Sequence, residues 1–547
     1  MSCCDQNGCS SSSTKQNIIF ILSILSAILI SDYLNITDLN SISFLQSILP
    51  NFLLSYLYIQ HADSHEKKVH LDAKLNTIFE KLKNLADQPL EKYKVAVGFG
   101  SCVDIFTDAV PLFEKLNIEA PPKNTNPEHY KVIKNKKELS SGFSYFFIKG
   151  AASERYISNE ELFDLLVENV DQKSAKFALG GNAPVMANRF AKEGRERVPK
   201  KNGEVDIILA AQFSSEFEKD GWMDEKVRFT GPRTEVADRH LILEYKQNEN
   251  FNHLVSPRAN RFIVHSDSHN PYLRGIDENF TKNFIKMQPN LLVISGLQMM
   301  DNIPYTTQQR TELIKKISNF CQEHRAVKTH FELASFVDND LVNEIIKEVI
   351  PFSDSIGCNE QELPNIYAAL TGKELITVAD SMPKVSNILD ILRQTFQILN
   401  RPDENGRDTG RKTSRIHVHT LAYQMIVQID DQETESRWPN IKKAAAKATV
   451  TAVRHICQND AVTAENIKIL LDNSFSTSNF PIDESSGNPK RIFIDPEEPV
   501  VCWTENDPII KKKIKFCLSV GLVCTAVKQT AGGGDNISAG ALAAQLP

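Results

Sequence analysis

The chain has 547 residues, of which 41% are hydrophobic, so it holds enough apolar material for a large core and for two lobes. Its formal net charge is −7, from 62 basic and 69 acidic residues, and no basic block dominates the sequence. Because binding to a phosphate backbone needs a clustered positive surface, this composition argues against nucleic acid as a partner.

The first predicted element is an apolar run over residues 17–30, NIIFILSILSAILI, with Lys15 before it and Asp32 after it. The run is shorter than the ~20 apolar residues that span a bilayer, but it has the length of a signal-peptide core. We expect residues 1–60 to be a signal or anchor followed by a linker, which places the protein in the secretory pathway, the endoplasmic reticulum or outside the cell. An uncleaved anchor would associate with the membrane, and a buried helix in a cytoplasmic protein is the third alternative.

The ten cysteines include no CxxC pair, which argues against a zinc motif with closely spaced ligands. A disulfide scaffold would be a shorter chain with a higher cysteine content. We therefore expect buried free thiols, with one disulfide if the chain enters the secretory pathway.

Residues 61–89 are predicted to form a helix, because apolar residues recur at spacings of three and four between Leu71 and Leu85. The run KVAVGFG, which starts at Lys94, is typical of a buried strand. We place the start of the main domain at residue 90 and its end at residue 547.

Several later segments repeat one pattern, in which a short apolar run precedes a turn and a helical pattern. The apolar runs are KFALGG, EVDIILAA, NLLVISGLQ and AVKTHFELAS; RIHVHTLAYQMIVQ is predicted to be a strand and then a helix, and SDSIGCNEQELPNIYAAL a turn that opens into a helix. Strands that alternate with helices predict a parallel α/β sheet covered on both faces. Because ligands of such sheets bind at the carboxyl ends of the strands, polar residues that follow each strand are the candidate site.

The strongest chemical signal is the C-terminal segment TAGGGDNISAGALAAQ, in which Gly532, Gly533 and Gly534 precede Asp535 and a helical pattern follows. Glycines let backbone N–H groups approach a phosphate closely, and the helix start adds its positive dipole end. An aspartate at this point can take the proton of an attacking hydroxyl. The segment therefore predicts phosphoryl transfer, with a flexible glycine-rich tail as the alternative. The sequence contains neither a GxxxxGK[ST] motif nor the protein-kinase motifs.

Six segments, in order along the chain, resemble motifs of the ADP-dependent glucokinase and phosphofructokinase family, whose members are ribokinase-like kinases. They are GGNAPVMAN (180–188), SPRANRF (256–262), HFELAS (330–335), NEQE (359–362), RIHVHTL (415–421) and GGGD (532–535). The eukaryotic glucokinase branch fits best, since an apolar N-terminal segment precedes the kinase there too. The resemblance implies a doubly wound ribokinase-like α/β sheet with a smaller α/β lid, mostly within residues 112–265.

The resemblance also implies roles for individual residues. Asp535 would be the catalytic base; Glu332, Glu362 and Asp535 would bind Mg²⁺; Gly532, Gly533, Gly534 and Arg261 would bind phosphate; Asn359 would lie at the nucleotide, which the RIHVHTL segment borders; and Asp104, Glu154, Gly181, Asn182 and His240 would contact the sugar. Residue chemistry agrees with these roles. Mg²⁺ takes a few carboxylates together with phosphate oxygens, a guanidinium binds phosphate oxygens in a bidentate way, and a carboxylate accepts hydrogen bonds from hydroxyls.

These assignments imply that a monomer transfers the β-phosphate of ADP to the 6-hydroxyl of glucose, giving glucose 6-phosphate and AMP, with the lid closing to exclude water. Three alternatives stay open: an ADP-dependent 6-phosphofructokinase, an ATP-dependent sugar kinase of the same fold, and a non-catalytic sugar or nucleotide sensor. Fructose 6-phosphate would need extra cations, and the sugar motifs contain no added cluster of lysine or arginine. The presence of Asp535 and both glutamates argues against a sensor.

Overall fold

The computed structural model describes residues 72–218, 221–375, 380, 382–401, 413–430, 437–479, 491–529 and 531–546. The apolar run at residues 17–30, which we expect to be a signal or anchor, lies outside the described residues. Of the helix predicted over residues 61–89, residues 72–89 are described: 72–86 are helical and 87–89 are not. No helix in the described part of the chain has both the length and the apolar composition needed to cross a membrane. The chain divides into two compact units, Met1–Asn76 and Thr77–Pro547, and the elements below belong to the second.

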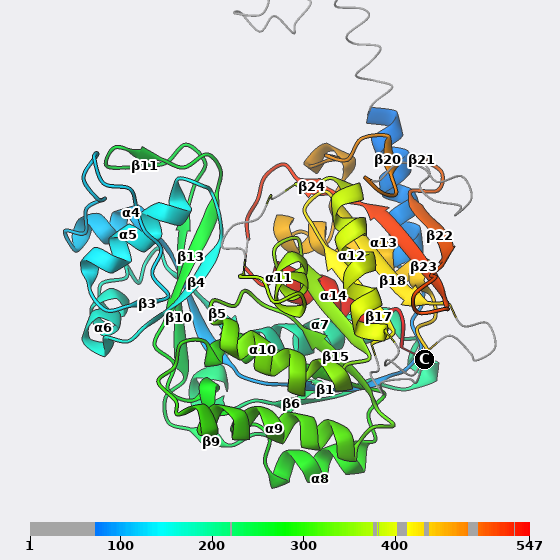
Figure 1. Cartoon of the computed structure of the whole chain (residues 1–547), viewed down its shortest axis with the longest axis horizontal. Coiled ribbons are helices and arrows are strands. Elements are labelled where there is room, and N and C mark those ends of the chain that lie inside the picture. The colour runs from blue at the N-terminus through cyan, green and yellow to red at the C-terminus, as the bar shows by residue number, and fades with distance from the viewer. Residues whose placement is uncertain are drawn as a thin grey trace, which may run out of the picture. The chain divides into compact units, whose positions relative to one another are not determined.

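The larger sheet has ten strands and carries a parallel core (Figure 1). Its order is β22 (Val500–Asn506), β23 (Lys513–Val520), β18 (Tyr423–Ile429), β17 (Arg415–His419), β16 (Ser355–Asn359), β15 (Lys328–Glu332), β14 (Leu291–Ile294), β1 (Lys94–Gly98), β6 (Asp206–Ala210) and β8 (Val227–Phe229). Neighbours from β17 to β8 are parallel, whereas β17, β18, β23 and β22 pair antiparallel. All four residues of β14 are buried, as expected of a strand covered on both faces.

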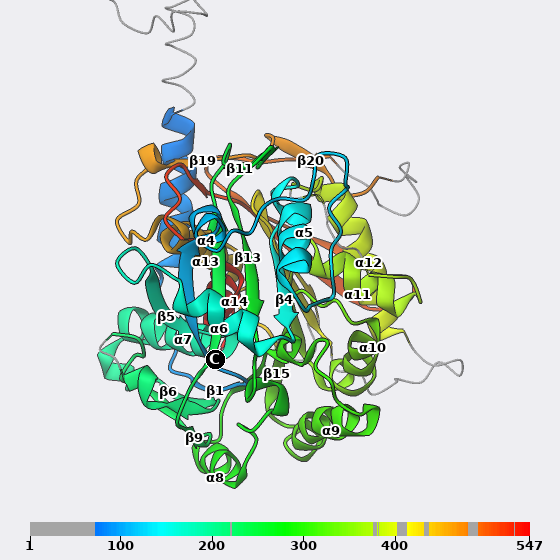
Figure 2. The ribbon, with the colours of Figure 1, turned by 90° about the vertical axis from the view of Figure 1, so that its left-hand side faces the viewer.

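Helices cover both faces of this sheet. Helix α14 (Gly533–Ala543) contacts both α7 (Asn182–Arg197) and α13 (Ile441–Cys457), and these three helices pack on strands of the larger sheet. Helices α9 (Thr307–Glu323), α10 (Asn339–Glu348), α11 (Glu362–Leu370) and α12 (Val385–Asn400) lie on the other side of the sheet in Figure 2. Helix α8 (Glu278–Met287) packs on α9 through the rings of Phe280 and Phe320. The predicted doubly wound α/β arrangement is confirmed.

Two predicted elements of the larger sheet were wrong. Ser355–Asn359, predicted to be a turn, is the strand β16, and Tyr423–Ile429, predicted to be helical, is the strand β18. Six of the seven residues of β18 are buried, so its apolar run does not alternate with polar residues. Without that alternation, the sequence pattern does not distinguish a buried strand from a buried helix. In β16, Gly357 resembles a turn residue, but it is glycine because a Cβ there would clash with the carboxylate of Glu332.

The smaller sheet has six strands, in the order β3 (Val132–Ile133), β4 (Ser153–Ile157), β13 (Asn260–His265), β10 (Asp238–Tyr245), β2 (Cys102–Asp108) and β5 (Lys176–Gly180). It therefore begins at Cys102, before residue 112, and residues 206–229 contribute β6 and β8 to the larger sheet. The run KFALGG forms β5, which pairs antiparallel with β2 and is not part of the parallel sheet. Helices α4 (Ala109–Lys115), α5 (Lys136–Phe147) and α6 (Glu160–Glu168) share an apolar core with this sheet.

The remaining strands form short two-stranded pairs. They are β7 (Phe213–Ser214) with β9 (Arg233–Thr234), β11 (Asn250–Phe251) with β12 (Leu254–Val255), β19 (Ile467–Lys468) with β24 (Val523–Cys524), and β20 (Ser474–Ser476) with β21 (Arg491–Phe493).

Two disulfides correct the expectation of free thiols. Cys457 at the end of α13 is bonded to Cys524 of β24, and Cys502 of β22 is bonded to Cys517, which lies directly opposite on β23. The other cysteines in the described residues, Cys102, Cys321 and Cys358, are buried and form no disulfide. The pairing could not be read from spacing, because it depends on which strands become neighbours.

We predict that the variant Cys457→Ser/Cys524→Ser melts at a lower temperature than Cys502→Ser/Cys517→Ser. The first disulfide spans 67 residues and the second 15, and the chain-entropy model assigns them roughly 4 and roughly 3 kcal/mol. Thermal melting without reductant measures the order, with Cys321→Ser as the control. The opposite order of melting temperatures, or peptide mapping that finds neither cross-link, would contradict the prediction.

Candidate active site

The glycine loop forms the start of α14, and each of its glycines has a different structural setting. Gly532 is the N-cap in a left-handed conformation, with φ of 69°. A Cβ on Gly534 would lie 2.8 Å from Cε1 of His419, whereas a Cβ on Gly533 would meet no atom within 4 Å. Packing therefore requires glycine at position 534 but not at position 533, whose backbone is open to a ligand. The first N–H groups of a helix lack partners within it and suit an anion.

Asp535 lies in the first turn of α14, and a chain of side-chain amides holds it. Asn182, the first residue of α7, donates from Nδ2 to Oδ1 of Asp535 at 2.8 Å. Gln298, in the 3-10 helix Leu297–Met300 that follows β14, donates from Nε2 to Oδ1 of Asn182 at 2.6 Å. The hydrogen bond from Gln298 fixes which end of the Asn182 amide faces the carboxylate. Asn182, expected to contact the sugar, thus contacts the candidate base. Gly181, its N-cap, adopts a φ of 89°.

Gln298 did not figure among the candidates from the sequence. It follows the strand NLLVI after only three residues, so the rule that polar residues after strands form the site could have found it. The side chain is buried, and its Oε1 has no hydrogen-bond partner in the described part of the chain.

The pKa of Asp535 is raised to about 7. Burial is the largest cause and the negative charge of Glu332 adds to it, while the hydrogen bond from Asn182 and the charge of His419 act in the opposite direction. A general base is most effective when its pKa lies near the working pH, so this carboxylate is suited to accept a proton at neutral pH.

Glu332 ends β15 and lies buried below α14. His330 Nε2 lies 2.8 Å from its Oε2, and Ser538 of α14 donates to its Oε1 at 2.9 Å. Burial acts to raise the pKa of Glu332, but the hydrogen bond from His330 and the nearby charges of His330 and His419, whose Nε2 lies 3.5 Å from Oε1, together outweigh burial and lower the pKa to about 2. Glu332 is therefore a permanent negative charge next to the glycine loop. His419 ends β17, so the RIHVHTL segment does border this site.

Glu362, the first residue of α11, accepts hydrogen bonds from Asn359 N at 2.9 Å and from Asn359 Nδ2 at 2.8 Å. Oδ1 of Asn359 in turn accepts from the backbone N–H of Glu362, so the side chain expected at the nucleotide caps this helix. Burial raises the pKa of Glu362 to about 8, and the negative charges of Glu332 and Glu360 add to the effect, while His419 opposes it. The carboxylates of Glu332, Glu360 and Glu362 thus repel one another, and the charge of His419 offsets only part of this repulsion.

Three of the sugar candidates, Asp104, Glu154 and His240, lie on one face of the smaller sheet, which we call the front face. It carries Cys102 and Asp104 of β2, Glu154 of β4, His240 of β10, and Arg261 and His265 of β13. Asp104 pairs with His240 across parallel strands, and alternate residues of a strand point to the same face. The intervening residues, such as Val103 and Leu241, pack into the apolar core with α4 to α6. A Cβ on Gly180 of β5 would clash with the Asp104 carboxylate.

His240 is 3% exposed and lies between two carboxylates. Its Nε2 is 3.0 and 3.1 Å from the two carboxylate oxygens of Asp267, and its Nδ1 is 3.5 Å from Oε1 of Glu154. Burial is the largest single cause and acts to lower the pKa of His240, but the charges of Asp267 and Cys102 and the hydrogen bond to Asp267 together outweigh it, so the pKa is raised well above its usual value. Burial raises the pKa of Asp104 to about 6, against the charge of His240.

Arg261 supplies a positive charge between the two sheets. Its charge acts on Asp104 of the front face and on Asp535 of α14. The Nε atom of Arg261 is buried and has no hydrogen-bond partner among the described residues. Because an unsatisfied buried donor is costly, a bound anion would stabilise this guanidinium.

A pocket joins the front face to the residues after β14. Glu154, Tyr156 and His265 line it from the smaller sheet, and Gln298 and Asp301 line it from the segment that follows β14. The structure therefore brings together the predicted residues Asp104, Glu154 and His240 on the front face, and Asn182 with Asp535 at α14.

Comparisons with known proteins identify the family of this chain. A family model described as the ADP-specific phosphofructokinase/glucokinase conserved region matches residues 93–544. ADP-dependent glucokinase from Bos taurus is 30% identical over 453 residues, which cover 82% of this chain and 83% of the relative. Probable ADP-dependent glucokinase from Caenorhabditis elegans is 27% identical and covers 89% of this chain and 92% of the relative.

Solved structures show the same fold. An ADP-dependent kinase in complex with fructose-6-phosphate and ADPbetaS superposes with a TM-score of 0.58 at 16% identity, over 87% of this chain and 97% of the other. The last common ancestor of ADP-dependent phosphofructokinases from Methanosarcinales gives a TM-score of 0.52 at 18% identity, over 87% of this chain and 98% of the other. The predicted ribokinase-like fold is thereby confirmed. Because the family model covers nearly the whole of the second unit, the chain belongs to the ADP-specific phosphofructokinase/glucokinase family of kinases.

Proposed function

We propose that this kinase phosphorylates D-glucose to glucose 6-phosphate with ADP as the donor, releasing AMP. The observation that carries the proposal is the contact of Asp535 with Asn182 at the start of α14, within the charge field of Arg261 and Asp104. The carboxylate of Asp535 thereby lies at the helix start that would bind the anion and within the charge field of the face that would bind the polyol. The relatives named ADP-dependent glucokinase support glucose and ADP as the substrates.

The reaction is an in-line displacement at the β-phosphorus. Asp535 accepts the proton of the sugar 6-hydroxyl, and the oxygen forms a bond to the β-phosphorus of ADP. The bond from that phosphorus to the oxygen bridging the α-phosphate breaks, and AMP leaves with the electron pair. The N–H groups of the glycine loop stabilise the charge on the transferred phosphoryl group, as is usual where positioning and electrostatics carry catalysis. Arg261 fits the same phosphate through its unpaired Nε.

The carboxylates beside α14 fit Mg²⁺. Glu362 and Asp535 are buried carboxylates whose pKa values are raised to about 8 and about 7, partly by the charge of Glu332. A divalent cation would compensate this negative charge, and Mg²⁺ prefers oxygen ligands of this kind. Glu332, Glu362 and Asp535 are the residues that would hold it, and the ion would neutralise charge on the phosphates.

Asp104, Glu154 and His240 bind the sugar hydroxyls in this proposal, and closure of the smaller sheet over the sugar excludes water. Water would otherwise accept the phosphoryl group and hydrolyse ADP. Two disulfides support residence in an oxidising compartment, in line with a secretory signal in residues 1–60. A monomer suffices, because every residue invoked here comes from one chain.

One activity assay tests the phosphoryl donor, the sugar acceptor and the catalytic base together. Purified full-length protein with Mg²⁺ is expected to form glucose 6-phosphate from glucose with ADP but not with ATP, and not to act on fructose 6-phosphate. Asp535→Asn should lower kcat by about 10²- to 10⁴-fold, because it removes the proton acceptor, while nucleotide binding persists. Asp340→Asn, in the exposed first turn of α10, is the matched control. Turnover with ATP alone, or full activity in Asp535→Asn, would contradict the proposal.

Alanine substitutions at Gly533 and Gly534 should separate an effect on folding from an effect on catalysis. Gly533→Ala is expected to fold normally, because no atom lies within 4 Å of the new Cβ, yet to lose activity because the methyl group occupies the phosphate side. Gly534→Ala should lower the melting temperature, because its Cβ would lie 2.8 Å from His419. Melting curves and initial rates measure both effects. A fully active Gly533→Ala would show that phosphate does not approach there.

Gln298→Leu is predicted to lower kcat by about 10- to 100-fold, the loss typical of a misplaced reacting group, without changing the KM for ADP. Loss of its hydrogen bond frees the Asn182 amide that positions Asp535. Gln308→Leu, exposed on α9, is the matched control. Gln298→Asn should recover part of kcat if positioning is the role; an unchanged kcat in Gln298→Leu would reject it.

A further inference from the structure

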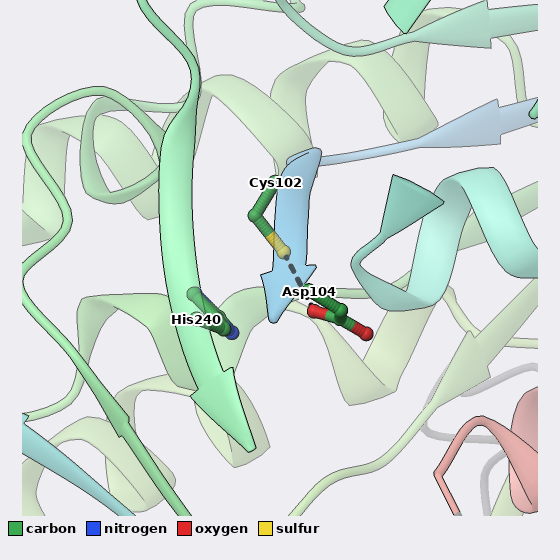
Figure 3. Close-up of side chains that lie close together, drawn as sticks. All are labelled: Cys102, Asp104 and His240. Atoms are coloured by element: carbon green, nitrogen blue, oxygen red, sulfur yellow. Dashed lines mark hydrogen bonds between the residues drawn. The ribbon is translucent and has the colours of Figure 1, made fainter. Parts of the chain in front are cut away.

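Three side chains of different donor chemistry meet on the front face: the thiol of Cys102, the carboxylate of Asp104 and the imidazole of His240 (Figure 3). One ligand atom from each lies within 4.8 Å of the others. The register explains the cluster, because Asp104 is opposite His240 on the neighbouring parallel strand and Cys102 precedes Asp104 by two residues on the same face. Cys102 has no role in the proposed reaction.

We propose that Cys102, Asp104 and His240 form a binding site for a thiophilic divalent cation of the Zn²⁺ class, which competes with the sugar. Sulfur, nitrogen and oxygen ligands from cysteine, histidine and aspartate are those that zinc takes in proteins. Three protein ligands leave one tetrahedral position for water. The front-face site thus differs from the carboxylate cluster beside α14, whose oxygen ligands suit Mg²⁺.

The surroundings of His240 supply the outer contacts of a metal-bound histidine. Histidine ligands usually donate the second ring N–H to a carboxylate, which orients the ring and fixes the tautomer. Whichever nitrogen of His240 binds the cation, the other has such a partner: Nε2 lies 3.0 Å from Asp267, and Nδ1 lies 3.5 Å from Glu154. Asp267 is itself held by Asn270, whose Nδ2 donates to it at 3.0 Å.

The charge balance also favours a cation. Three carboxylates, those of Asp104, Glu154 and Asp267, surround His240, and His265 lies 3.4 Å from Asp267. Buried charge is costly unless it is paired, so a doubly charged ion would stabilise this group. On binding, a bond forms between zinc and Sγ of Cys102, and the thiol proton leaves to solvent. Burial raises the pKa of the Cys102 thiol, so the cation must displace this proton.

The expected competition between zinc and glucose rests on the proposed function, because Asp104 and His240 are the residues proposed to bind glucose. A cation on these two side chains and a sugar on the same pair exclude one another. Glucose is therefore expected to weaken zinc binding, and zinc to raise the apparent KM for glucose without lowering the extrapolated kcat.

The test is equilibrium dialysis of Zn²⁺ against the full-length protein, without reductant and without nucleotide. Wild type should bind one more tight equivalent than Cys102→Ser, which should lose at least about 100-fold in affinity at this site, since even outer partners of a metal ligand contribute 10- to 100-fold. Cys321→Ser, a buried cysteine on α9, should match wild type. Any zinc bound by Cys3, Cys4 and Cys9 is common to all three proteins, so it cancels when their zinc contents are subtracted. X-ray absorption spectra of the bound zinc should show more sulfur ligation, at about 2.3 Å, in wild type and Cys321→Ser than in Cys102→Ser.

Equal zinc binding by wild type and Cys102→Ser would overturn the metal site, as would a bound zinc without a sulfur difference. Asp104→Asn provides a second variant if Cys102→Ser lacks a cooperative melting transition, and it should also lose the tight equivalent. Zinc held through Cys102 with an affinity that glucose does not change would uphold the metal site, and it would overturn the placement of the sugar here. The two failures are therefore distinguishable.

Discussion

One hydrogen bond, from Asn182 Nδ2 to Asp535 Oδ1, joins two helix starts that lie 353 residues apart in the chain. Helix α7 begins directly after β5 of the smaller sheet, and α14 packs on the larger sheet. The bond therefore links the start of α7, next to the smaller sheet, to the start of α14 on the larger sheet. Asp535 lies in the first turn of α14, and Asn182, the first residue of α7, donates to it. The proposed base, the anion-binding loop and the sugar face are all placed relative to this contact.

The smaller sheet is both a core element and a binding surface because its side chains alternate between two faces. Val103 and Leu241 point into the apolar core, while their neighbours Asp104 and His240 face the site. A shift of one residue in the pairing would exchange these faces, so the buried core specifies the register. The packing of the smaller sheet against α4 to α6 thus positions polar side chains that lie outside that apolar core.

Differences in environment give the carboxylates of the site different states. Histidine neighbours lower the pKa of Glu332, whereas burial and the negative charge of Glu332 raise the pKa values of Glu362 and Asp535. The three carboxylates therefore differ in how readily they lose a proton. The front face holds a second group of carboxylates, but there Cys102 and His240 add sulfur and nitrogen. The two places therefore differ in the class of cation that their donor atoms favour.

The sequence alone determined the α/β class and the glycine loop with Asp535, because these depend on local period and glycine content, and its resemblance to a kinase family pointed to the two glutamate motifs. Tertiary structure decided which sheet received KFALGG, that AYQMIVQ is a strand, and that four cysteines pair. It also showed that Asn182 and Asn359 have the protein partners Asp535 and Glu362, and it revealed Gln298. These features are contacts between distant segments or choices among partners. A local pattern shows that a residue is buried or polar, but only the assembled sheets decide what lies beside it.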